Sequence, residues 1–364
     1  MSAAAIAPMA LQRTATPSAA PASPSTGKSW LFGPWLDLLF IANVAWPFLL
    51  LAGLTGGVAK GRPISFWMVY FIATPHRWIT LVLVFFDPDR FQQNARAFLG
   101  LAAAAALACV GSYLIWGLPG VYALLAVDFL WNAWHFASQH AGILRIYRRN
   151  VAGNQAGSGT VEKLLVRAFL LFVFLRLASL TLPMEERFGS YLEQLKAVST
   201  HLSLLDLPIL LVPVGLLVRE LAWLRPVSYG RLAYLVSVCT LYSLLLGSVH
   251  AHYVSGDGST AAVVMALAAA VSVFHSSEYF AVVSWAATRK RNPRGILGYL
   301  APRWIATLAI FLTLMAVTAL VMDTWFAGVW LVINLIVSFL HYAYDGIIWK
   351  SRKASTPAPK TTDQ

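Results

Sequence analysis

Apolar runs of about twenty residues, each bounded by proline, glycine or charged residues, follow one another along most of the chain. A run of this length crosses the hydrocarbon core of a bilayer as a helix. The pattern therefore predicts an all-α protein, a polytopic transmembrane helical bundle of about ten spans. The predicted spans are residues 34–57, 64–86, 97–117, 119–144, 162–183, 205–224, 229–255, 259–287, 301–322 and 325–349.

The connections between these spans alternate in their content of Lys and Arg. Basic residues gather near 90–96, 145–163, 219–231 and 289–294, whereas the alternate connections hold mainly glycine and acidic residues. Only Lys60 and Arg62 oppose the pattern. Because basic connections stay in the cytoplasm, we expect an even number of spans with both termini cytoplasmic, in the inner (cytoplasmic) membrane of a bacterium.

Composition supports a membrane protein and excludes other classes. The 364 residues are 59% hydrophobic and 12% charged, where a soluble domain has about a quarter charged residues. The net charge of +12 comes from short clusters between apolar runs, so it indicates membrane topology and a lipid bilayer partner, with no nucleic acid. Cys109 and Cys239 both lie inside apolar runs, which indicates neither a disulfide framework nor a thiolate metal cluster.

The two ends of the chain differ from the spans in composition. Residues 1–29 are rich in Ala, Pro, Ser and Thr and lack a continuous apolar core, so we interpret them as a disordered cytoplasmic tail and not as a cleaved signal. Residues 350–364 are expected to form a second disordered cytoplasmic tail. Residues 30–349 are then the transmembrane helical domain, with no soluble domain between the spans.

Two of the predicted spans carry a stripe of polar residues. At about 100° per residue, successive spacings of four, three and four residues keep the side chains within an arc of about 60°. The fourth span has this spacing in Asp128, Asn132, His135 and Gln139, and the tenth has it in Asn334, Ser338, His341 and Asp345. Polar groups are costly in lipid, so we expect both stripes to face the inside of the bundle and to mark its functional site.

Four histidines are predicted to lie at a similar depth. His76, His135, His275 and His341 each precede the next charge of a cytoplasmic connection by some two to four helical turns. Four imidazoles from four helices would then meet in one layer, in the cytoplasmic half of the membrane. Neutral imidazole is the commonest metal ligand in proteins.

Acidic and phenolic residues accompany two of these histidines. Glu278 and Tyr279 lie one turn from His275, and Asp345 lies one turn from His341. A carboxylate at this spacing either binds a metal or orients the imidazole that does. A set of His, Glu and Asp without Cys favours iron, zinc, copper or manganese over iron–sulfur chemistry.

Three other histidines are harder to place. His140 is rotated by about 140° from His135 on a helix, so it belongs either to a second metal or to a hydrogen bond with a neighbouring helix. His250 and His252 point about 200° apart, and both reach one centre only if the helix unwinds near Gly247. We include His250 as an additional ligand candidate.

Charged residues at similar depth have two interpretations. Arg176, near the middle of the fifth span, either neutralises Asp128, Glu278 or Asp345 or holds an anionic group of a substrate. Arg77 beside His76 allows the same two interpretations.

The pattern of these residues resembles the integral-membrane histidine-motif metal oxygenases, a group that includes fatty-acyl desaturases and hydroxylases and the bacterial carotene-cleaving dioxygenases. The resemblance rests on scattered positions: His135 with His140, His250 with His252, His275 with Glu278, and His341 with Asp345. It implies nonhaem iron held by histidines of several helices, dioxygen activation, and oxidation of a lipid or isoprenoid. The chain has no His-x-x-His-His box, so the resemblance implies a mononuclear or otherwise arranged centre and not a desaturase-like diiron cluster.

The first functional hypothesis is an integral-membrane, metal-dependent oxidoreductase with iron as the expected metal, acting on an apolar lipid or isoprenoid and served by an electron donor. His135, His275 and His341 are its expected ligands. The full set of candidate ligands is His76, His135, His140, His250, His252, His275 and His341. The residues expected to assist the chemistry are Glu278, Asp345, Tyr279, Asp128 and Arg176.

Two alternatives remain open from the sequence. One is a haem-binding membrane electron-transfer protein, in which histidines of facing helices supply the axial ligands. The other is a proton-coupled transporter, in which Asp128, Arg176, Glu278 and Asp345 relay protons or bind a substrate.

Overall fold

The computed structural model describes residues 29–56, 68–152, 159–181, 198–224, 227–289 and 295–349. All regular elements in these ranges are helical, as the apolar runs predict. The α-helices are α1 (Pro34–Leu36), α2 (Trp46–Gly56), α4 (Thr74–Phe85), α5 (Pro88–Trp116), α6 (Leu118–Ala152), α7 (Thr160–Thr181), α10 (Leu211–Ala222), α11 (Tyr229–Ser255), α12 (Gly258–Arg289), α13 (Gly295–Leu300) and α14 (Trp304–Ile348). Shorter π-helical and 3-10 segments are η1 (Asp37–Ile41), η3 (Met68–Ala73), η5 (Pro208–Leu210) and η6 (Ala301–Arg303). The two predicted tails, 1–29 and 350–364, lie outside the described residues except for Ser29.

Long apolar helices make the fold compatible with an integral membrane protein. Within the described residues, five helices are long and apolar enough to cross a bilayer, by length and composition. They are Pro34–Thr55, Pro88–Trp116, Tyr229–Ser255, Gly258–Thr288 and Gly298–Ile348. The count of ten spans stays a prediction.

Helix α6 is not one of these five although its 35 residues are more than long enough to cross a bilayer. The reason is the polar stripe that includes Asp128 and His135, which lowers the hydropathy of the helix. Helix α7 carries Glu162, Lys163 and Arg176 and is likewise not among the five. Helices α12 and α14 also carry buried polar groups, but their apolar stretches are long enough to place them among the five.

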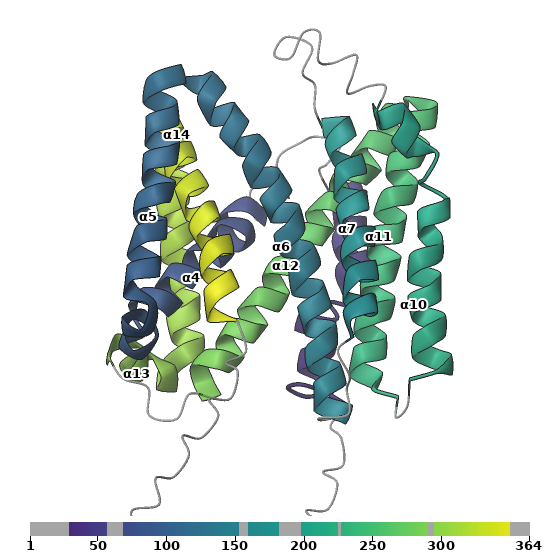
Figure 1. The fold of residues 1–364 in the computed structure, drawn as a ribbon, viewed down its shortest axis with the longest axis horizontal. Helices are drawn as coiled ribbons and strands as arrows, with labels where there is room; N and C mark the ends of the chain where they lie inside the picture. The colour runs from purple at the N-terminus through teal and green to yellow at the C-terminus, as the bar shows by residue number, and fades with distance from the viewer. Residues whose placement is uncertain are drawn as a thin grey trace, which may run out of the picture.

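Helix α14 is broken at Phe326, whose φ of −139° and ψ of 39° are not helical. A straight helix of this length would separate its ends by about 66 Å. Trp304 at its start and Ile348 at its end nevertheless pack into the same apolar cluster, with Tyr279 and Val283 of α12. The chain therefore reverses at Phe326 (Figure 1), close to the boundary expected between the ninth and tenth spans.

The helices form two groups joined by α6 and α12 (Figure 1). On one side α7, α10 and α11 pack together. Their largest apolar cluster also includes residues of η1, α2, α6 and α12. On the other side α14 packs against α4 and α5. Where the two groups meet, α14 contacts α4, α6 and α12, α4 contacts α12, and Gln139 of α6 binds α12. Side chains of these four helices build the candidate site.

A cluster of ion pairs ties together the end where α6 finishes and α11 begins. Glu162 of α7 is 2.6 Å from Arg219 of α10, 2.9 Å from Arg231 of α11 and 3.6 Å from Arg148 of α6. Arg231 also pairs with Glu220, at 2.9 Å. Because Glu162 and Arg231 are buried, the attraction between these charges is less screened than at a surface.

The first described residues lie at the same end of the bundle. The Asn150 side chain donates to the carbonyl of Trp30 at 3.1 Å, and the Ser228 hydroxyl donates to the carbonyl of Ser29 at 3.0 Å. Residues 29 and 30 are therefore neighbours of two of the basic connections.

We expect Glu162→Gln to lower the free energy of unfolding by about 3 kcal/mol, because it removes a buried carboxylate that three guanidinium groups share and leaves Glu220 alone to neutralise the buried Arg231. Thermal unfolding of the detergent-purified protein measures this loss. The double variant Glu162→Gln/Arg219→Gln should lose less stability than the sum of the two single variants. Additive losses would contradict a direct interaction.

Candidate metal centre

Four imidazoles meet where α4, α6, α12 and α14 contact one another. The ring centroids of His76 and His275 are 5.2 Å apart, those of His275 and His135 5.0 Å, those of His135 and His341 4.6 Å, and those of His341 and His76 5.0 Å. All four side chains are buried. We call these four residues the histidine cluster. The predicted meeting of four imidazoles from four helices is thus found in the structure.

The ring nitrogens of the cluster are close enough to share a metal ion. Donor atoms within 4.8 Å of one another form two overlapping sets, one of His76, His275 and His341 and one of His135, His341 and Asp345. His341 belongs to both. Its Nε2 is 3.1 Å from Nε2 of His135, and Asp345 Oδ2 is 3.9 Å from the same His135 atom.

Several of these nitrogens have no hydrogen-bond partner among the described residues. They are Nε2 of His76 and both ring nitrogens of His275. Buried polar atoms without partners are rare and costly in folded proteins. A cation bound between the imidazoles would satisfy Nε2 of His76 and one of the two nitrogens of His275, so the residues present fit a metal ion.

Local structure fixes two of the rings. The π-helical segment η3 runs into α4, whose second residue is Pro75, a residue without an N–H that suits a first helical turn. His76 follows, and its Nδ1 lies 3.1 Å from the Ser276 hydroxyl, which leaves Nε2 directed elsewhere. The His275 ring is stacked on Phe136, with centroids 3.7 Å apart and planes at 14°.

A chain of hydrogen bonds orients His341. Tyr279 donates to Asp345 Oδ1 at 2.6 Å, and the Thr80 hydroxyl lies 2.5 Å from the Tyr279 oxygen and 2.7 Å from Nδ1 of His341. Because the Tyr279 hydroxyl donates its hydrogen bond to Asp345, the Tyr279 oxygen accepts one from the Thr80 hydroxyl. The Thr80 oxygen in turn accepts a hydrogen bond from Nδ1–H of His341. That order leaves a lone pair on His341 Nε2, the nitrogen that faces His135.

The two polar stripes face inward, as predicted. On α14, Asn334 accepts from Trp78 at 3.3 Å and Ser338 accepts from Arg77 at 2.6 Å. On α6, Asp128 accepts from Tyr342 at 3.1 Å. Asp128 thus binds a neighbour of the histidine cluster and belongs to neither set of donor atoms.

His140 and Glu278 form a second buried polar group beside the histidine cluster. His140 Nδ1 is 2.6 Å from the Tyr234 hydroxyl and 3.2 Å from Glu278 Oε1, and its Nε2 is 3.0 Å from the Tyr242 hydroxyl. Glu278 Oε2 accepts from Gln139 at 2.8 Å. Of the two interpretations of His140, the structure favours hydrogen bonds to a neighbouring helix, because both tyrosines lie on α11.

The structure does not bring His250 and His252 to the cluster. Both lie near the end of α11, where His250 Nδ1 is 3.0 Å from Asp206 and His252 Nδ1 is 2.8 Å from the Thr260 hydroxyl. Helix α11 stays continuous through Gly247, so it does not unwind to turn both imidazoles toward one centre. Neither residue belongs to a described set of metal-binding donors.

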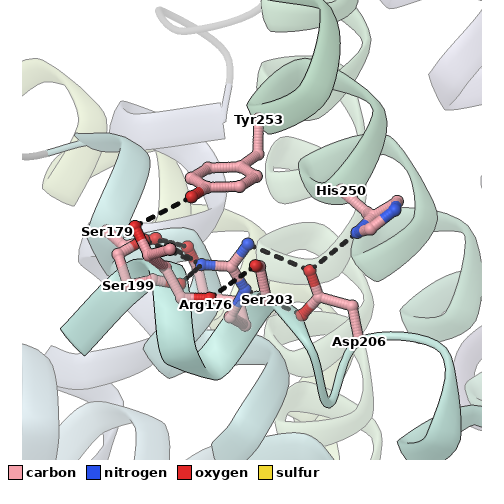
Figure 2. A network of polar contacts seen from close by, with 8 residues as sticks. Arg176, Ser179, Ser199, Ser203, Asp206, His250 and Tyr253 are labelled. Carbon is pink, nitrogen blue, oxygen red and sulfur yellow. Dashed lines mark hydrogen bonds and ion pairs between the residues drawn. The ribbon is translucent and has the colours of Figure 1, made fainter. Parts of the chain in front are cut away.

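The expected charge partner of Arg176 is also different. Figure 2 shows its guanidinium bound to Asp206 through two bonds, of 2.7 and 2.9 Å. It also donates to the Ser199 hydroxyl at 2.9 Å and lies over the Tyr253 ring. Arg176 therefore neutralises Asp206 and not Asp128, Glu278 or Asp345. The sequence did not single out Asp206, which stands at the predicted start of the sixth span; the structure places it in the turn before η5.

A pocket of about 780 Å³ lies next to the histidine cluster. His135, Tyr279 and Asp345 contribute to its wall, and most of the remaining wall is apolar or aromatic. The aromatic and apolar lining includes Trp131, Trp134, Ile143, Ile146, Val282, Tyr342, Ile347 and Trp349. Such a lining suits an apolar molecule that reaches the cluster.

Comparisons of the chain with protein-family models, with curated proteins and with solved structures found no match.

Asp206→Asn should lower the free energy of unfolding by about 3 kcal/mol, because Arg176 is then a buried charge without its carboxylate. We expect the metal content to stay unchanged, since this ion pair is separate from the histidine cluster. Thermal unfolding and elemental analysis test the two statements together. Asp257→Asn, at an exposed turn, is the control and should leave stability within about 0.5 kcal/mol. Loss of metal in Asp206→Asn would contradict a purely structural role.

Proposed function

We propose that the protein is an integral-membrane, metal-dependent oxidoreductase, with nonhaem iron at the histidine cluster, that oxidises an apolar lipid or isoprenoid. The observation that carries the proposal is the meeting of four buried imidazoles, two of them with unpartnered nitrogens, beside a mostly apolar pocket. Burying so many unpaired polar atoms is expensive unless they serve a bound ion.

Four residues would hold the metal. His135, His275 and His341 are the ligands expected from the sequence, and the ring distances add His76 to them. Imidazole nitrogens suit iron, zinc, copper and nickel. Iron at this place would supply dioxygen activation for the oxidation of the bound substrate.

The surrounding residues position the ligands and handle protons. Asp345, Tyr279 and Thr80 keep His341 Nδ1 engaged, so that Nε2 faces the centre. Asp345 Oδ2 is free to bind the metal or to hold a proton near His135. Gln139 and Glu278 connect α6 to α12. The Gln139 side chain donates to Glu278 Oε2 at 2.8 Å and to the His275 carbonyl at 3.0 Å.

The membrane arrangement is part of the same proposal. We infer ten spans, both termini in the cytoplasm, and the inner membrane of a bacterium as the location. The ion pairs of Glu162 and the contacts of residues 29 and 30 support it, because they gather two basic connections and the start of the described chain at one end of the bundle. An electron donor would then approach from the cytoplasm.

The geometry does not favour a haem-binding electron carrier. Bis-histidine ligation places a porphyrin between two imidazoles. In the histidine cluster the rings pack edge to face at 4.6 to 5.2 Å, and Phe136 covers His275. No slot for a macrocycle separates them. A proton-coupled transporter is the alternative that the following experiment distinguishes.

Elemental analysis and an absorption spectrum of the detergent-purified protein test the proposal. We expect iron near one equivalent per chain or above, with no Soret band. His275→Gln should lose the metal because it removes a central ligand, whereas the matched variant His252→Gln should keep it. Full metal retention in a folded His275→Gln protein contradicts the assignment, a Soret band favours the haem carrier, and absence of any metal favours the transporter.

Thr80→Val tests the positioning role of the hydrogen-bond chain without changing side-chain size. Metal affinity, measured by competition with a chelator, should fall by about 10- to 100-fold. Thr80→Ser should restore most of the affinity because it restores the hydroxyl. If Thr80→Val binds the metal as tightly as the native protein, Thr80 has no role in orienting His341.

Single cysteines test the orientation, in a background where Cys109 and Cys239 are replaced by alanine. A membrane-impermeant maleimide applied to intact cells should label Asp257→Cys in the turn after α11. It should label Arg303→Cys only after the cells are permeabilised. The reverse result would invert the proposed topology.

A further inference from the structure

One end of the pocket is basic. Arg145 and Arg149 of α6 and Arg167 of α7 line it there. Nearby arginines at the same end of the bundle are neutralised, since Arg148 and Arg219 pair with Glu162. In the part of the chain that the structure describes, the three arginines of the pocket form no ion pair with a carboxylate.

Two of these guanidinium groups have unused hydrogen-bond donors, and one of the two is held in place. The Nε atoms of Arg145 and Arg167 are buried and have no partner among the described residues. Arg167 lies over the Trp134 ring, with its central carbon 4.6 Å from the ring centroid. This cation–π contact fixes the charge at the pocket wall. Fixed guanidinium donors are suited to the oxygens of a carboxylate or phosphate.

A single face of α6 connects the arginines to the histidine cluster. His135, Gln139, Gly142, Arg145 and Arg149 all line the pocket. The rise of a helix places Arg145 about 15 Å and Arg149 about 21 Å from His135. The pocket wall between them holds the polar Ser138 and Gln139 and then Gly142 and Ile143, with mostly apolar and aromatic residues opposite, so an extended hydrocarbon chain could follow it.

Glycines keep this path open. Gly142 of α6 and Gly346 of α14 both line the pocket, and a Cβ atom added at either would meet no atom within 4 Å. Side chains at these two positions would therefore extend into free space along the pocket.

From these contacts we infer that the pocket binds an amphiphile with an anionic head group, a carboxylate or a phosphate, and one apolar chain. The head group lies on Arg145, Arg149 and Arg167, and the chain passes Gly142 to end at the histidine cluster. The further statement that this amphiphile is the substrate rests on the proposed function. The chain is then oxidised about 15 Å or more from the head group.

Brominated lipids test the binding site, because bromine quenches the fluorescence of nearby tryptophans such as Trp131 in the pocket wall. Dibrominated stearic acid should quench at a concentration at least about tenfold lower than dibrominated stearyl alcohol, which has the same chain without the charge. In Trp131→Phe the quenching should decrease. Dibrominated phosphatidylglycerol and dibrominated phosphatidylcholine are compared in the same way. Stronger quenching by the phosphatidylglycerol identifies the anionic ligand as a membrane phospholipid, whereas a charge preference confined to stearic acid identifies it as a free fatty acid.

Variants separate the contribution of the head group from that of the chain. Arg145→Gln/Arg149→Gln should remove the preference for the acid over the alcohol, whereas Arg303→Gln, a basic residue outside the pocket wall, should keep it. Gly142→Phe should weaken binding of acid and alcohol alike, because it fills the path of the chain. Equal quenching by charged and neutral probes in the native protein, for fatty acids and for phospholipids, would overturn the inference.

The metal-free variant distinguishes this inference from the proposed function. His275→Gln should bind dibrominated stearic acid like the native protein, because the arginines are intact. If the native protein holds iron but shows no charge preference, the inference fails and the proposed function stands. If it shows the preference but holds no metal, the lipid site stands and the oxidoreductase does not.

Discussion

A polar side chain inside a membrane bundle must find its partner on another helix, and this requirement governs how α4, α6, α12 and α14 pack. Water is absent from the hydrocarbon core, so an unpaired group keeps its full desolvation cost. The contacts of Thr80 with Tyr279 and His341, and of Tyr279 with Asp345, join three of these helices. Gln139 joins α6 to α12 through Glu278 and the His275 carbonyl. One of the bonds that hold the helices together, that of Thr80 with Nδ1 of His341, also orients an imidazole of the cluster.

The charged and imidazole residues of the site could be found from the sequence because their cost in lipid makes them conspicuous. Helical spacing gave the inward faces of α6 and α14, and depth gave the meeting of His76, His135, His275 and His341. Thr80, Ser276 and Phe136 could not be found in this way, since hydroxyl and aromatic residues are common in membrane helices and have no distinctive cost. Their roles depend on which helix lies opposite, and that is a property of tertiary packing.

Charge partners were predicted less well than positions. One interpretation of Arg176 paired it with a carboxylate of the site, but in the structure its guanidinium binds the carboxylate of Asp206, which lies in a connection. His250 belongs to the same group through Asp206. A charge buried near a helix end can be neutralised by a connection that folds over it, and spacing along a helix carries no information about that. The reversal at Phe326, by contrast, lies next to the boundary that the apolar runs predict between residues 322 and 325.

The place of His341 in both sets of donor atoms has a consequence for metal selectivity. Its Nδ1 is engaged by Thr80, so a single nitrogen serves the all-imidazole set and the set that contains Asp345. Under the proposed function, the two sets would therefore compete for one ion and would not be two independent sites. An ion that prefers nitrogen ligands would bind toward His76 and His275, whereas one that prefers oxygen would bind toward Asp345. The hydrogen bond from Tyr279 to Asp345 would influence this preference, because a carboxylate that accepts a hydrogen bond is a weaker metal ligand. The phenol of Tyr279 could therefore decide which metal would be retained.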